Sequence, residues 1–308
     1  MLTLRARKVN NYNLYSNHAW FVPGVGGMFG LLGWFLVGNI LGGLVIGIVS
    51  PFVPQSVITD YSMLVVYPLS FLPAMVYAAR KSQKNSLFDT GYQLNSRHFG
   101  PFKAWQMVLI TVLLTFATMI STDYISYLNF KATTSTPAMK AFYDQIVELL
   151  GQMMGGPFWS SFLLTAIFAP IFEEWLCRGM VLRGLLIRMK PAWAIVVSAL
   201  FFALIHMNPW QALIAFVAGL VMGYVYYKSG SLILTMIIHF VNNGTAVILS
   251  QFSSLEEVDF WIDIIPKGTY ITLSVVGVIC LYVCLIAFRR IPLEQKRGNI
   301  DTVALNID

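Results

Sequence analysis

The sequence is poor in charge: charged residues make up 11% of its 308 residues, whereas hydrophobic residues make up 57%. Soluble domains contain about a quarter of charged residues, so this composition excludes an ordinary soluble enzyme. The mean hydropathy of +0.69 is that of a membrane protein. Because no polar stretch between the apolar runs is long enough to fold alone, we predict a single integral membrane domain over residues 1–308.

Cysteine is also scarce. Only Cys177, Cys280 and Cys284 are present, all within apolar segments and without the spacing of metal ligands. An odd number of this kind excludes a disulfide framework. We expect all three to be small buried side chains, and a nucleophilic role for Cys177 is disfavoured.

Long apolar runs are what the sequence does contain. A transmembrane helix needs about 20 mostly apolar residues, and the runs predict an all-α, multi-pass helical bundle of about eight spans. Residues 139–154 have apolar residues at helical spacing beside charged ones, which is typical of a helix at the membrane interface. The predicted spans are 24–49, 61–79, 105–124, 158–182, 191–208, 210–227, 231–250 and 270–288.

The basic residues indicate the orientation, since Lys and Arg prefer cytoplasmic loops. With the N-terminus inside, Lys131, Lys140 and Lys267 are the only basic residues in the outer loops. We therefore expect both termini in the cytoplasm, with residues 1–23 as an arm and 289–308 as a tail, and we expect the cell membrane as the location. The net charge of +6 is scattered singly between apolar runs, so membrane lipids are expected as partners and nucleic acid is not.

Two adjacent carboxylates interrupt the fourth predicted span. Of the 14 acidic residues, only Glu173 and Glu174 lie well inside a span. A charge at mid-membrane costs roughly 2.5–3.5 kcal/mol on insertion scales, so such groups are retained for partners or for function. Arg178 lies one helical turn beyond Glu174, where an ion pair forms easily, and the pair can be purely structural. Glu173 points about 100° away and is the candidate proton acceptor.

Two histidines also lie inside predicted spans. Glu173 and His206 are almost equally far from Lys190, at the turn between the fourth and fifth spans. Both therefore lie at the same depth, about 25 Å from that turn. His239, in the seventh span, can reach the same cytoplasmic half of the membrane. Asn243 follows His239 by one helical turn and shares its face.

These side chains suit the hydrolysis of an amide by an activated water. Glu173 and His206 can polarise the water, and His239 with Asn243 can donate to the developing oxyanion. A metal-dependent alternative stays open, because one carboxylate with two histidines is a known catalytic zinc ligand set. In that case Glu173, His206 and His239 would bind Zn²⁺, although the sequence lacks a compact His-x-x-x-His pair.

Three motifs occur in order on separate predicted spans, and together they resemble a known family. The family is that of the CAAX proteases and bacteriocin-processing enzymes (CPBP, or Abi), which includes the Ras-converting CAAX prenyl endopeptidases. The resemblance covers about residues 160–250. The motifs are Glu173-Glu174-x-x-x-Arg178, Phe202-x-x-x-His206 and His239-x-x-x-Asn243.

The resemblance implies an intramembrane endopeptidase with its catalytic core in 158–250, cutting near the cytoplasmic side of the membrane. It implies the same roles for the water-activating and oxyanion residues, with Glu174, Arg178 and Phe202 in support. The family has been described both as metalloendopeptidases and as glutamate-dependent proteases. We favour the second, which requires no cofactor. The implied partner is a peptide or protein substrate, lipidated in the CAAX-processing members.

Two other functions remain as alternatives. A transporter or channel would use the carboxylates and histidines as a proton or ion relay, and it predicts ionisable residues along a path through many spans. A non-catalytic immunity or scaffold protein would retain the fold without the reaction. The clustering of the motifs on three predicted spans favours the endopeptidase.

Overall fold

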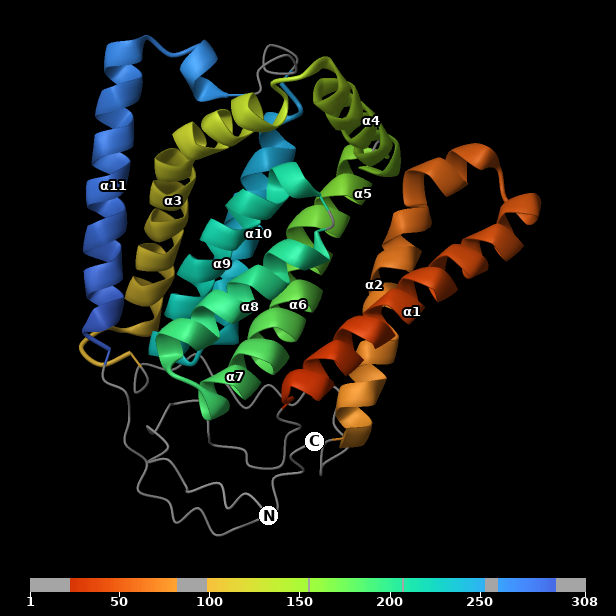
Figure 1. Ribbon diagram of the computed structural model, residues 1–308, viewed down its shortest axis with the longest axis horizontal. Helices are drawn as coiled ribbons and strands as arrows, with labels where there is room; N and C mark the ends of the chain where they lie inside the picture. The colour runs from red at the N-terminus through yellow and green to blue at the C-terminus, as the bar shows by residue number, and fades with distance from the viewer. Residues whose placement is uncertain (1–22, 82–98, 155, 207, 253–259, 292–308) are drawn as a thin grey trace.

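The computed structural model describes residues 23–81, 99–154, 156–206, 208–252 and 260–291. Within these ranges the chain is helical and contains no strand, which confirms the all-α prediction. The predicted arm and tail lie outside the described residues, apart from a few positions at their inner ends, and the orientation of the termini stays a prediction. The main helices (Figure 1) are α1 Val25–Val49, α2 Gln55–Lys81, α3 Ala104–Thr133, α4 Pro137–Met154, α8 Pro191–Ile205, α9 Pro209–Ser229, α10 Leu232–Leu249 and α11 Lys267–Arg289.

Seven helices among the described residues are long and apolar enough to cross a membrane. The predicted fifth span, 191–208, is the exception, because α8 has only 15 residues. Its length is about 22 Å, less than the roughly 30 Å of a hydrocarbon core. Asn208 ends the apolar run by capping α9, with its side chain accepting from Trp210 N at 3.0 Å. The helix therefore stops early, and His206 lies at its end.

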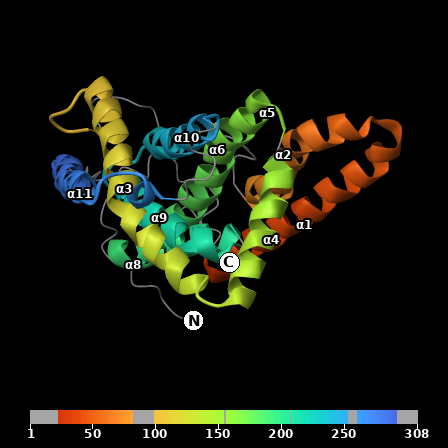
Figure 2. The same ribbon diagram turned by 90° about the horizontal axis from the view of Figure 1, so that it is seen from above.

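The spans run up and down between two ends of the bundle (Figure 1). The predicted helix at 139–154 is present as α4, which follows α3 at the end of the bundle where α5 begins. Figure 2, seen from above, shows α4 lying across that end instead of running parallel to the spans. Lys140 pairs with Asp144 on its exposed side. Its place at a membrane interface stays a prediction.

α1 and α2 form a hairpin that projects from one side of the bundle (Figure 2). The two helices touch closely at Gly38, where an added Cβ would lie 2.2 Å from the backbone oxygen of Ser70. The hydroxyl of Ser70 donates to Asn39 Oδ1 at 3.1 Å. A residue without a side chain is therefore required at this crossing, as in other close helix contacts in membranes.

We expect Gly38→Ala to destabilise the protein by roughly 1–3 kcal/mol, because the new methyl group overlaps backbone atoms that cannot move aside alone. Gly33→Ala is the matched control on the same helix, since nothing lies within 4 Å of a Cβ at that position. Thermal unfolding in detergent measures both variants. Equal melting temperatures for the two would contradict the close crossing.

Candidate active site

The candidate site is built on one continuous helical run from Phe158 to Arg188. It consists of α5 Phe158–Phe162, the π-helix η3 Leu163–Phe168, α6 Ala169–Glu174, the π-helix η4 Trp175–Leu182 and α7 Arg183–Arg188. Glu173 and Glu174 end the short α6, between the two π-helical segments. Such segments are rare and occur frequently at functional sites. Figures 1 and 2 show α6 between α10 on one side and α2 on the other.

The π-helix η3 explains how Asn243 is held. Pro170 has no N–H, and in a regular α-helix this would free the carbonyl of the residue four positions before it, Ala166. In η3 the N–H of Ala169 instead bonds to Leu164 O, five residues back. In that register the hydrogen bond that Pro170 cannot donate is the one to the carbonyl of Thr165. This carbonyl instead accepts from Asn243 Nδ2 at 2.9 Å. The externally bonded carbonyl is therefore that of Thr165.

Glu174 forms a fully buried ion pair with Arg178, one helical turn further along. Arg178 Nη1 donates to Glu174 Oε1 at 2.5 Å, and both side chains have no exposed surface. Arg178 Nη2 also donates to the carbonyl of Gly219 at 3.2 Å, which ties η4 to α9. The pairing that the sequence suggested is present, and it joins two helices of the bundle.

Glu174 also fixes His239. The Nδ1 atom of His239 lies 3.2 Å from Glu174 Oε1. A carboxylate only accepts hydrogen bonds, so His239 donates its Nδ1–H, and its Nε2 atom is left for another partner. A carboxylate behind the imidazole is a common way to set its tautomer and orientation.

His206 is fixed in the same sense by a different group. Its Nδ1 atom lies 2.7 Å from the carbonyl oxygen of Phe202. Because a carbonyl also only accepts, His206 carries its hydrogen on Nδ1, and Nε2 is free in the neutral ring. The Phe202-x-x-x-His206 motif therefore works through the Phe202 backbone as well as its ring.

Glu173 faces both histidines. Its Oε2 atom lies 3.9 Å from His206 Nε2 and 3.9 Å from His239 Nε2, and it is buried without a hydrogen-bond partner. Atoms at this separation can share one water molecule at about 2.8 Å from each. The structure thus brings Glu173, His206 and His239 together around one point, as the sequence predicts.

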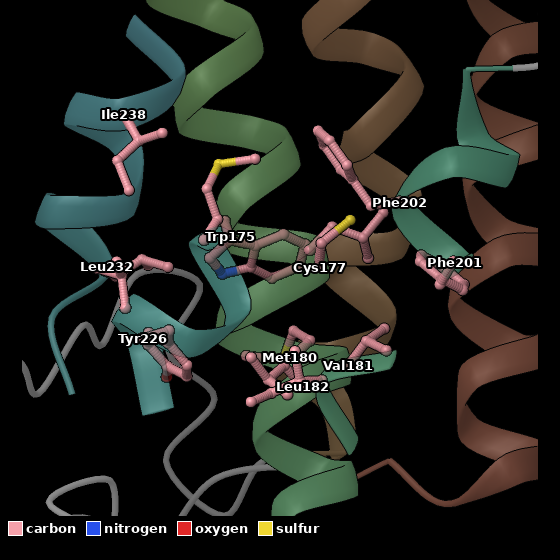
Figure 3. Close-up of a cluster of buried hydrophobic side chains, with 14 of the residues drawn as sticks. Trp175, Cys177, Met180, Val181, Leu182, Phe201, Phe202, Tyr226, Leu232 and Ile238 are labelled. Carbon is pink, nitrogen blue, oxygen red and sulfur yellow. The ribbon is translucent and has the colours of Figure 1, made fainter. Parts of the chain in front are cut away.

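Phe202 packs beneath these groups. The Arg178 guanidinium lies over the Phe202 ring, 4.3 Å from the ring centroid. The rings of His206 and His239 pack edge-on against Phe202, with centroid separations of 4.8 Å and 5.6 Å. Figure 3 shows the surrounding cluster of buried hydrophobic side chains, to which Phe202, Cys177 and Trp175 all belong. Cys177 and Cys284 are buried, as expected, whereas Cys280 is only partly buried.

A zinc ion would be held by Glu173, His206 and His239. The donor types fit, because both imidazoles present Nε2 with Nδ1 held from behind. The spacing fits less well: ligand atoms in a tetrahedral zinc site lie about 3.3 Å apart, against 3.9 Å here. No group of three His, Cys, Asp or Glu within the described ranges is arranged to hold a metal ion. The spacing in this conformation therefore does not fit zinc.

One residue at the site was not identified from the sequence. The hydroxyl of Tyr67, on α2, donates to Glu173 Oε1. No spacing in the sequence connects Tyr67 to Glu173, which follows it by 106 positions. The only local signal is a phenol in the middle of an apolar run, and tyrosines are common in such runs.

Comparison with known proteins supports the resemblance found in the motifs. Residues 155–245 match the model of the family described as type II CAAX prenyl endopeptidase Rce1-like. No curated protein and no solved structure gives a significant match. The matched residues include all three motifs. Helix α2, which contributes Tyr67 to the site, lies outside the match. The segment that carries the candidate site is therefore similar to the Rce1-like family.

Proposed function

We propose that the protein is an intramembrane endopeptidase that cleaves with a water activated by Glu173 and His206. The observation that carries the proposal is the position of Glu173 Oε2, buried without a partner and equally far from two imidazole Nε2 atoms. Each of the three groups is oriented by a separate hydrogen bond, so the arrangement is preorganised. The Glu173 and His206 side chains are 13% and 22% exposed, and the proposal requires that water enters from this exposed side.

The reaction uses these side chains as follows. Glu173 Oε2 takes a proton from the water while His206 Nε2 helps to orient it, and the hydroxide formed attacks the carbonyl carbon of the peptide bond. In its protonated form His239 donates its Nε2–H to the oxyanion, with its Nδ1–H held by Glu174. Glu173 then passes the proton to the leaving amine, and the C–N bond breaks.

Asn243 has two roles in this proposal, one structural and one in oxyanion stabilisation. One hydrogen of its amide is held by the Thr165 carbonyl, and its oxygen accepts from Asn242 Nδ2 at 3.0 Å. The second amide hydrogen is the further oxyanion donor that the family resemblance assigns. The bond to Thr165 ties the position of Asn243 to the π-helical segment of the catalytic run.

The substrate class that we propose first is a membrane-bound protein with a prenylated C-terminal Cys-aliphatic-aliphatic-X tail, cleaved near the cytoplasmic face of the cell membrane. This follows from the description of the matched family and from the orientation that the basic residues predict. The proposal of a membrane-bound substrate is supported by the seven helices among the described residues that are long and apolar enough to cross a membrane.

The test compares cells that express the wild type, Glu173→Ala or His206→Ala. Precursors that are shortened by the wild type should accumulate as full-length proteins in the membranes of both variants, and mass spectrometry of C-terminal peptides detects them. In detergent, the wild type should cleave a fluorogenic peptide that ends in a farnesylated Cys-aliphatic-aliphatic-Met tail. If both variants match the wild type in every cleavage, the protein is not this endopeptidase.

The same purified protein decides the role of a metal. Zinc content measured on the wild type and on His239→Ala should show no stoichiometric metal in either, and chelators should leave the cleavage rate unchanged. Stoichiometric zinc that is lost with His239→Ala would instead favour the metal-dependent alternative, with Glu173, His206 and His239 as ligands.

A further inference from the structure

The carboxylate of Glu173 is held by one group from outside the matched segment. The phenol of Tyr67, on α2, donates to Oε1, while Oε2 has no hydrogen bond. The two oxygens of this carboxylate are therefore not equivalent. One is anchored on α2, and the other faces the two histidines at 3.9 Å.

The anchoring matters because a carboxylate turns easily about its last carbon–carbon bond, where the torsion is broad. Without an anchor, either oxygen could face the histidines, and the group could also turn away from them. A hydrogen bond to Oε1 restricts this rotation. It thereby keeps the lone pairs of Oε2 directed at the place where the water would be shared.

The phenol is itself held in place by aromatic neighbours. The ring of Tyr67 packs against Phe71 at 5.3 Å and against Phe172 at 6.5 Å. Phe172 and Phe71 stack on each other at 5.4 Å. Since Phe172 directly precedes Glu173, the same cluster positions both partners of the hydrogen bond.

The path of α2 at this point depends on α1. Pro68 and Pro73 lie inside α2, and each removes a hydrogen bond of the helix. The weakened turn is the one that α1 contacts, through Gly38 and through the Asn39–Ser70 hydrogen bond. The hairpin thus supports the turn that carries the phenol.

We propose that Tyr67 is a positioning residue of the site, which acts through Glu173 by fixing the carboxylate with Oε2 toward His206 and His239. This inference rests on the proposed endopeptidase function and adds to it a residue of the N-terminal hairpin. Tyr67 is not itself a catalytic residue, because its hydroxyl contacts the Glu173 carboxylate, whereas the water would lie between Glu173, His206 and His239.

Tyr67→Phe removes the hydroxyl and keeps the ring. We expect kcat for the farnesylated peptide to fall by about 10–100-fold, as for other small losses of orientation, with KM and the melting temperature unchanged. Tyr61→Phe, at an exposed position of the same helix, is the matched control and should behave as the wild type. In a Glu173→Gln background, Tyr67→Phe should cause no further loss, because its effect passes through the carboxylate.

An infrared measurement tests the contact without a substrate. The carboxylate band of Glu173 is identified as the difference between the spectra of the wild type and Glu173→Gln. Tyr67→Phe should shift this band, because a strong hydrogen bond to one of its oxygens is lost, and Tyr61→Phe should leave it in place.

The outcomes separate the two proposals. If Glu173→Gln cleaves as the wild type does, the endopeptidase proposal fails, and the role of Tyr67 fails with it. If Glu173→Gln is inactive while Tyr67→Phe retains the wild-type kcat, or leaves the carboxylate band in place, only the inference about Tyr67 is overturned. If the melting temperature of Tyr67→Phe also falls, and the loss of kcat is fully explained by a smaller folded fraction, the role of Tyr67 is structural and the inference is overturned as well.

Discussion

Replacing Glu173 with glutamine should reduce kcat by about 10²–10⁴-fold, the contribution typical of a general base. Glutamine has nearly the same shape, and its amide oxygen can still accept from Tyr67. In that orientation it presents an NH₂ group to the histidines in place of Oε2, and this group cannot take a proton from water. The rate of cleavage of the farnesylated peptide at saturating concentration measures the loss.

The fold should not suffer from this change. Glu173 forms no short ion pair, since both of its imidazole neighbours lie at 3.9 Å. We therefore expect the melting temperature of Glu173→Gln in detergent to stay close to that of the wild type. A variant that loses activity only in proportion to its folded fraction would contradict a role in the chemistry.

Replacing Arg178 with alanine should have the largest effect on stability. Breaking a buried ion pair by removing one partner costs about 3–5 kcal/mol, because the other charge remains buried. Here the orphaned group is Glu174, which has no exposed surface. The variant also loses the bond to Gly219 O and the contact with the Phe202 ring. The free energy of unfolding in detergent measures the loss.

Two comparisons show where the loss arises. Arg80→Ala, at an exposed position near the end of α2, should change the free energy of unfolding by no more than about 0.5 kcal/mol. Adding Glu174→Gln to Arg178→Ala should restore part of the stability, because the buried charge is removed. If Arg178→Ala unfolds within about 1 kcal/mol of the wild type, the buried pair does not support the bundle as described.

The sequence predicts those parts of the molecule that depend on local patterns. The spans follow from hydropathy, and the Glu174–Arg178 pair follows from i, i+4 spacing on a helix. The equal depth of Glu173 and His206 follows from counting residues to the turn at Lys190. These predictions need only the rise of a helix and the position of its ends, and the structure brings the two side chains together.

Three features depend on information that local patterns do not hold. The early end of α8 follows from the Asn208 cap and Pro209, signals that hydropathy alone overlooks. The choice of Thr165 as the bonded carbonyl follows from a π-helical register that shifts partners by one residue. The contact of Tyr67 with Glu173 joins helices far apart in the sequence and follows from packing alone.

The division of roles between the two adjacent glutamates is tested most directly by the single-turnover cleavage rates of Glu173→Gln and Glu174→Gln, each corrected for the folded fraction of the sample. Glu173 transfers the proton, whereas Glu174 holds Arg178 and His239 in place. Glu173→Gln should therefore be fully folded and nearly inactive, whereas Glu174→Gln should be less stable and retain the higher rate per folded molecule. A wild-type rate for folded Glu173→Gln would show that Glu173 does not transfer the proton.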